Sequence, residues 1–85
     1  MFGTDIGAER LDLTRLADGR AGRVVGLQGG REAVGRLEAM GIVVGSVIEK
    51  KSSALRRGPI VIGRGSTQVA LGFGIAKGIL VEPIA

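Results

Sequence analysis

The chain has 85 residues, enough for one small domain, and twelve Lys and Arg against eight Asp and Glu give it a formal net charge of +4. It contains no Cys, His, Trp or Tyr, which excludes disulfide frameworks, zinc and iron–sulfur centres, and catalytic Ser–His–Asp or Cys–His groups. A hydrophobic fraction of 45% predicts that the chain folds. The net positive charge is compatible with an anionic partner, but it does not indicate whether that partner is nucleic acid, lipid or protein.

The N-terminal residues show no hydrophobic period, and we interpret residues 1–10 as a flexible leader before a single domain of residues 11–85. No basic region precedes an apolar core there, as a secretion signal would require. The longest uncharged stretch, residues 65–76, is too short for a spanning helix of about 20 residues. A cytoplasmic location without a membrane span is therefore expected.

Turn signals divide the remaining chain into short elements. Apolar patterning predicts strands over residues 21–27, 46–52, 59–64, 67–71 and 79–84. Arg31 to Met40 instead repeats its apolar residues at helical spacing, and Gly41 follows where a left-handed C-cap is expected. Gly65-Ser66 is a hairpin turn, and residues 72–78 form a glycine-broken connector. Five strands and one short helix predict a mainly β fold, a small barrel whose closed sheet has no exposed edges.

Motifs that carry chemistry are absent or weak. Neither the P-loop nor the dinucleotide-binding glycine motif occurs, and the glycines are better explained by turns. Glu32 and Glu38 are six residues apart, so on a helix they point in different directions and form no metal site. Catalysis would need a Ser–Lys pair or paired carboxylates, and nothing in the sequence suggests a buried lysine with a lowered pKa. We therefore expect no enzyme and no cofactor.

Nucleic-acid binding is a weaker alternative. Five cations gather around one predicted hairpin region: Lys50, Lys51, Arg56, Arg57 and Arg64. Small barrels that bind single strands normally stack bases on surface aromatic residues. Phe2 lies in the leader and Phe73 in the apolar connector, so no stacking platform is expected. A solvated basic edge explains these cations better.

Several short motifs occur in an order and spacing that resemble the FeoA family, the ferrous iron transport protein A. They extend over Leu13 to Val81 and comprise Gly19 to Val25, Gly29-Gly30 with Arg36 to Ile42, Gly45-Ser46, Gly58 to Ile62, Val69 to Leu71 and Ala76 to Val81. The resemblance implies a five-stranded Src-homology-3-like barrel. The same module forms the C-terminal domain of metal-dependent repressors, and a chain without a DNA-binding domain favours a free-standing FeoA-like protein.

The resemblance also implies a role. FeoA-like proteins are small cytoplasmic partners of FeoB, the membrane GTPase that carries ferrous iron, and act by protein contact. We expect this chain to contact a FeoB-like transporter, and through it the membrane, without holding iron itself, because it lacks His and Cys. Two other interpretations stay open: a small basic barrel that binds nucleic acid or the ribosome, and a free-standing repressor-type domain.

The candidate contact surface combines the helix end with a basic loop. It comprises Arg36, Leu37, Met40 and Gly41, together with Arg56 and Arg57. For Leu37 and Met40 a place in the core is favoured over a place in an interface, and for Gly41 a helix cap is favoured. Gly72, Gly74 and Gly78 depart from the family pattern around Phe73 and Ile75. These two apolar residues pack inward or form a patch for self-association or partner docking.

Overall fold

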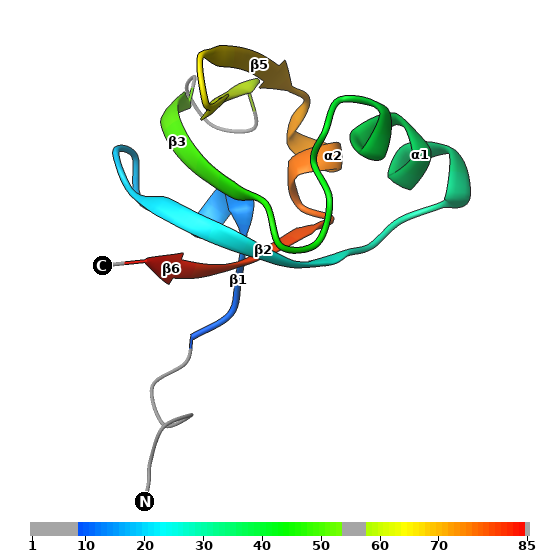
Figure 1. The fold of residues 1–85 in the computed structure, drawn as a ribbon, viewed down its shortest axis with the longest axis horizontal. Coiled ribbons are helices and arrows are strands. Elements are labelled where there is room, and N and C mark those ends of the chain that lie inside the picture. The colour runs from blue at the N-terminus through cyan, green and yellow to red at the C-terminus, as the bar shows by residue number, and fades with distance from the viewer. Residues whose placement is uncertain (1–8, 54–57, 85) are drawn as a thin grey trace, which may run out of the picture.

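The structure is a computed structural model that describes residues 9–53 and 58–84 (Figure 1). The elements in chain order are β1 (Leu11–Asp12), the 3-10 helix η1 (Leu13–Arg15), β2 (Ala21–Leu27), α1 (Arg31–Ala39), β3 (Val47–Ser53), β4 (Ile60–Arg64), β5 (Thr67–Leu71), α2 (Phe73–Ala76) and β6 (Ile79–Ile84). The predicted mainly β class is confirmed, and the strands over residues 21–27, 67–71 and 79–84 have the predicted bounds.

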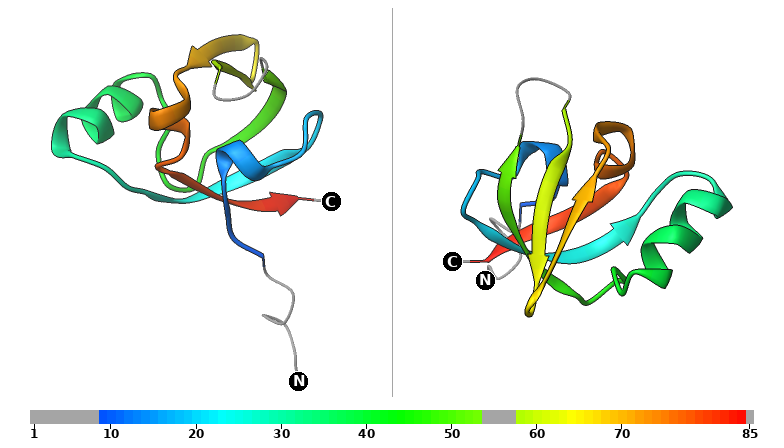
Figure 2. Two further views of the ribbon diagram at one scale, coloured as in Figure 1. Left: turned by 180° about the vertical axis from the view of Figure 1, so that it is seen from behind. Right: turned by 90° about the horizontal axis from the view of Figure 1, so that it is seen from above.

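The strands form one antiparallel sheet of six strands in the order β1-β6-β2-β3-β4-β5. Its register shifts between Val24 and Gly26 and again between Lys50 and Ser52. Such bulges strengthen the local twist, and the sheet curls around its inner face (Figure 2).

Two details of the predicted barrel were wrong. The sheet has six strands because Leu11–Asp12 pairs with β6, and a two-residue strand is too short to leave a sequence pattern. The sheet is also open. Within the described residues, β1 and β5 are the end strands, and each pairs with one neighbour only.

The core fills the concave side of the sheet. Its buried residues come from nearly every element: Leu13, Leu16, Val24, Leu37, Ile42, Ile48, Ile60, Ile62, Leu71, Ala76, Ile79 and Val81. In β4, Ile60 and Ile62 are buried and Val61 is half-buried, which is the two-residue alternation of a strand. Leu13 and Leu16 show that η1 belongs to the packed domain.

Helix α1 lies to one side of the sheet, beyond the end of β2 (Figures 1 and 2). It ends one residue earlier than predicted, with Met40 as C-cap and Gly41 at φ +84°. The Gly41 N–H donates to the Glu38 carbonyl and the Ile42 N–H to the Leu37 carbonyl, both at 2.9 Å. This pair of bonds is a Schellman motif, so the predicted left-handed cap is present.

Gly35 lies inside α1, and a Cβ added there would meet open space. Gly35→Ala is therefore expected to raise the free energy of unfolding by about 0.5–1 kcal/mol, because glycine is a poor helix former. Urea denaturation measures the change. Gly41→Ala is the matched control and should be destabilising, because residue 41 has a positive φ and its Cβ would lie 2.9 Å from Arg64 Nη1. Equal effects of the two substitutions would contradict this explanation.

The connector of residues 72–78 contains the short helix α2, between β5 and β6. Ala76 is fully buried, and Phe73 and Ile75 are half-buried and pack against the core. The connector is thus folded inward, with part of each large side chain still accessible. No helix in the described part of the chain is long and apolar enough to cross a membrane.

Candidate partner-binding site

Four large hydrophobic residues are exposed in the part of the chain that the structure describes. They are Met40 at 40% relative exposure, Val43 at 41%, Val44 at 62% and Val47 at 48%. All four lie in one short stretch from the end of α1 to the start of β3, which we call the 40–47 surface. Apolar side chains gathered in this way are typical of interaction sites.

Two left-handed glycines determine which of these side chains face outward. Gly41 and Gly45 have φ values of +84° and +100°, which other residues rarely adopt. The turn at Gly41 directs Ile42 into the core, where it is 1% exposed. Val43 and Val44, which follow immediately, remain on the surface.

Ser46 holds this loop in one shape. Its hydroxyl donates to the Gly41 carbonyl and accepts from the Val43 N–H, each at 3.1 Å. The Ser46 N–H donates to the Val43 carbonyl at 2.9 Å, and the Val24 N–H donates to the Ser46 carbonyl at 2.8 Å. The 40–47 surface is therefore preformed, which reduces the entropy lost when a partner binds.

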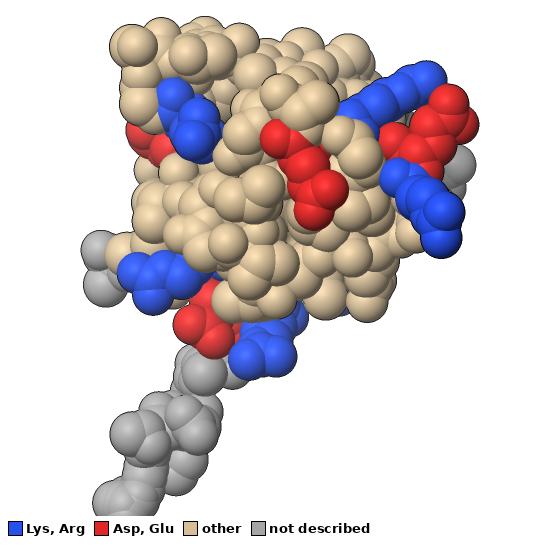
Figure 3. All heavy atoms as spheres, turned by 45° about the vertical axis from the view of Figure 1, so that its right-hand side comes forward, with Lys and Arg blue, Asp and Glu red and all other residues tan. Residues whose placement is uncertain are grey.

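Arginines lie next to the 40–47 surface. The Arg64 guanidinium packs over Gly41, because a Cβ there would lie 2.9 Å from its Nη1. Arg23 is directly opposite Val47 in the β2–β3 register, so both side chains project from the same face of the sheet. Arg36 is one turn before Met40 on α1 and pairs with Glu32 at 3.8 Å. Seen from the α1 side, a broad area is mostly uncharged, with acidic side-chain atoms near its middle and basic groups toward its margins (Figure 3).

A hollow of about 210 Å³ adjoins Val47 on the outer face of the sheet. It exists because Ala21, Glu49 and Gly63 are neighbours across β2, β3 and β4, and two of these residues have little or no side chain. Its lining comprises Ala21, Val47, Ile48, Glu49, Lys51, Gly63 and Gly65. Glu49 and Lys51 are paired to each other at 3.1 Å.

The predicted contact residues fall into different environments. Met40 and Arg36 are exposed at the helix end, whereas Leu37 is 1% exposed and belongs to the core. Gly41 is the helix cap described above. Arg56 and Arg57 lie outside the described residues.

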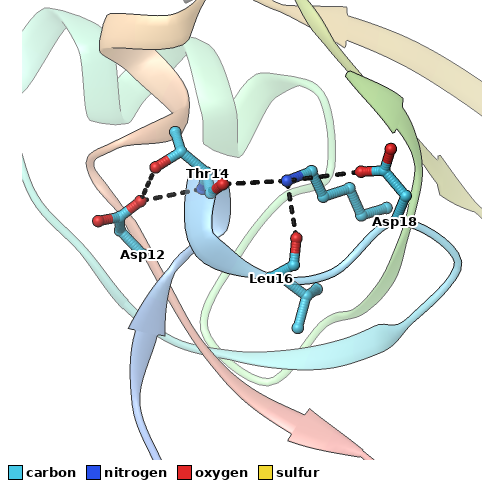
Figure 4. A network of polar contacts seen from close by, with 5 residues as sticks. Asp12, Thr14, Leu16 and Asp18 are labelled. Carbon is cyan, nitrogen blue, oxygen red and sulfur yellow. Dashed lines mark hydrogen bonds and ion pairs between the residues drawn. The ribbon is translucent and has the colours of Figure 1, made fainter. Parts of the chain in front are cut away.

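The predicted basic edge was wrong for Lys50, which is only 3% exposed. Its ammonium group donates to the carbonyls of Thr14 at 3.1 Å and Leu16 at 2.7 Å, and lies 3.7 Å from Asp18 Oδ1 (Figure 4). Lys50 thus fastens the N-terminal segment to β3. Nothing in the sequence indicated that this lysine is buried, but a cation can be buried where carbonyl groups surround it.

Sequence reasoning missed Val43, Val44 and Val47, and it missed Arg23 as their neighbour. The turn pattern identifies residues 42–44 only as the exit from the helix. The sequence nevertheless contains a signal for this surface. Residues 42–44 are three consecutive apolar residues between Gly41 and Gly45, and so short a turn cannot direct all three side chains into the core.

The described residues contain no group of three or more His, Cys, Asp and Glu that could hold a metal ion. The arrangement has instead the features of a protein contact: apolar centre, arginine margin, adjacent hollow and fixed backbone.

A family model and solved structures both connect the chain to FeoA proteins. The FeoA domain model matches residues 11–83. A crystal structure of an iron uptake regulatory protein (FeoA) is 32% identical, with a TM-score of 0.82 over 89% of this chain and 100% of that one. The FeoA-like protein from Clostridium acetobutylicum is 25% identical, with a TM-score of 0.79 over 89% of this chain and 88% of that one.

A manganese-dependent transcriptional repressor shares the fold, with 22% identity and a TM-score of 0.81 over 88% of this chain and 42% of that one. No curated protein sequence matches the chain. The fold is thus the Src-homology-3-like fold of FeoA proteins, in an open form. The chain belongs to the FeoA domain family.

Proposed function

We propose that this protein acts in ferrous iron transport as a small interaction module that binds and regulates a FeoB-type membrane GTPase. The observation that carries the proposal is the preformed apolar 40–47 surface on a chain of the FeoA family. Family membership supplies the iron-transport context, and the exposed surface supplies a means of contact.

The donor chemistry of the chain supports contact with the transporter over carriage of iron. Imidazole and thiolate are the usual protein ligands of transition metals, and the sequence contains neither His nor Cys. Glu32 and Glu49, two of the described carboxylates near the 40–47 surface, are paired with Arg36 and Lys51. Glu38 also lies there, but no further His, Cys, Asp or Glu of the described residues joins it in a group of three that could hold a metal ion. The protein therefore acts on the GTPase without delivering metal to it.

Binding to the transporter tests the proposal. Chelator-treated protein is expected to bind the full-length GTPase in nanodiscs saturably in at least one nucleotide state, with the same affinity before and after Fe(II) is added. Calorimetric titration measures both. Empty nanodiscs of the same lipid are the control. Absence of binding in the nucleotide-free, GTP-analogue and GDP states would contradict the proposal, as would binding that requires iron.

A further inference from the structure

We propose that the 40–47 surface takes a segment of the GTPase that presents apolar side chains flanked by Asp or Glu, with one apolar side chain seated in the hollow beside Val47. This inference rests on the proposed function and goes further, because it names the chemistry of the docking segment. Its basis is the combination of apolar centre, charged margin and hollow in one preformed region.

The charged margin selects an acidic segment. Arg23 and Arg64 form no ion pair with any residue that the structure describes, although both lie beside the 40–47 surface. Three nearby carboxylates already have cationic partners: Glu32, Glu49 and Glu82, the last of which lies opposite Arg23 in the β2–β6 register. The exposed Glu38, two residues before Met40, has no ion pair with a described residue. Arg23 and Arg64 together outweigh this single carboxylate. The unpaired positive charge near the surface therefore favours carboxylates on the partner, which would steer association and fix its register.

The residue types favour a protein over a lipid surface. Met and Arg are enriched at protein interfaces, whereas Lys is depleted there. The cations beside Met40 and Val47 are the arginines Arg23, Arg36 and Arg64, apart from Lys51 in the hollow, which is paired with Glu49. Membrane-surface segments instead rely on Trp, Phe and Lys beside a long amphipathic face. The 40–47 surface is a short loop held by Ser46, a shape that suits a matching protein segment.

Charge also argues against a second copy of this chain. Each copy has a formal net charge of +4. A two-fold contact through the same surface would bring the two sets of arginines together, because isologous contacts present the same patch on both sides. The opposite charge must come from a different chain.

The hollow provides the anchor position. Its floor is the outer face of the sheet at Ala21, and the Lys51 side chain lies across Gly63 as one wall, because a Cβ there would lie 2.7 Å from Lys51 Cε. Val47 connects the hollow to the exposed loop. Interfaces commonly place one buried side chain in such a pocket, surrounded by contacts that exclude water. A side chain from the acidic segment can therefore enter here while its neighbours cover Val43 and Val44.

Val44→Asp is the direct test, with the full-length GTPase in nanodiscs as the probe. It should weaken binding by about tenfold or more, because it places a carboxylate where apolar side chains and other carboxylates must pack. Ala70→Asp adds the same charge at an exposed position on β5 and should bind like wild type. Thermal denaturation of both variants verifies that they remain folded.

Two further experiments test the role of charge in binding and identify the GTPase segment that contacts the 40–47 surface. Arg23→Gln should weaken binding and reduce its salt dependence, whereas Arg15→Gln, at an exposed position on η1, should do neither. A photocrosslinking amino acid at position 44 should attach to a GTPase segment that contains apolar residues next to Asp or Glu.

Each failure is distinguishable. GTPase binding that is unaffected by Val44→Asp contradicts this inference and leaves the proposed function standing. Crosslinks to a second copy, to lipid or to a basic segment contradict the inference in the same way. Absence of wild-type binding in every nucleotide state contradicts both.

Discussion

Gly78→Ala is expected to destabilise the domain strongly, because an added Cβ would collide with the Gln28 carbonyl oxygen and lie 3.2 Å from its carbon. The Gln28 N–H also donates to the Gly78 carbonyl at 2.7 Å, so neither backbone can move away without losing this bond. We expect the free energy of unfolding to fall by about 2–4 kcal/mol. The melting temperature should fall by roughly 10–30 °C in a domain of this size.

Gly74→Ala is the matched control, because it makes the same change four residues earlier in the connector. A Cβ there would meet open space, and residue 74 lies within α2. It should leave stability unchanged or raise it by up to about 1 kcal/mol. Calorimetry on both variants makes the comparison. Equal stability of the two would show that the approach between Gly78 and Gln28 does not matter.

Lys50→Met is expected to lower the free energy of unfolding by about 1–3 kcal/mol. Methionine retains much of the side-chain packing but cannot donate hydrogen bonds. The backbone carbonyls of Thr14 and Leu16 would lose the ammonium group that now binds them at 3.1 and 2.7 Å. Replacing a buried ion pair with apolar residues can be neutral when both partners change. In this domain only the lysine is replaced, because its partners are backbone carbonyls, which would be left without their hydrogen-bond donor.

Lys51→Met separates this effect from a general loss of positive charge. Lys51 is the next residue on the same strand, but it is exposed, and among the described residues its ammonium group pairs with Glu49 alone, at 3.1 Å. Exposed pairs of this kind contribute little, so a change below about 1 kcal/mol is expected. Urea denaturation at constant ionic strength measures both variants. A larger effect at residue 51 than at residue 50 would refute the anchoring role of Lys50.

The glycines of the connector, residues 72–78, have two different roles that the sequence alone does not distinguish. The sequence shows three interrupting glycines, which predict a broken connector without distinguishing among them. In the structure Gly72 and Gly74 face open space, whereas Gly78 is required by the approach of the Gln28 carbonyl, directly after β2. Whether Phe73 and Ile75 take part in self-association or docking stays a prediction, although their packing against the core reduces the surface they offer.

Local patterns in the sequence determined the mainly β class, most strand positions, the helix and its Gly41 cap, because period, turn residues and capping act over a few neighbouring residues. The exclusion of thiol and imidazole chemistry likewise followed from composition. Tertiary structure alone decided three matters: the pairing of Leu11–Asp12 with β6, the burial of Lys50 and the exposure of Val43, Val44 and Val47. Each of these features depends on which segments distant in sequence lie next to the residue. Lys50 is buried because backbone carbonyls from another segment surround its ammonium group, and the valines are exposed because no described element covers them.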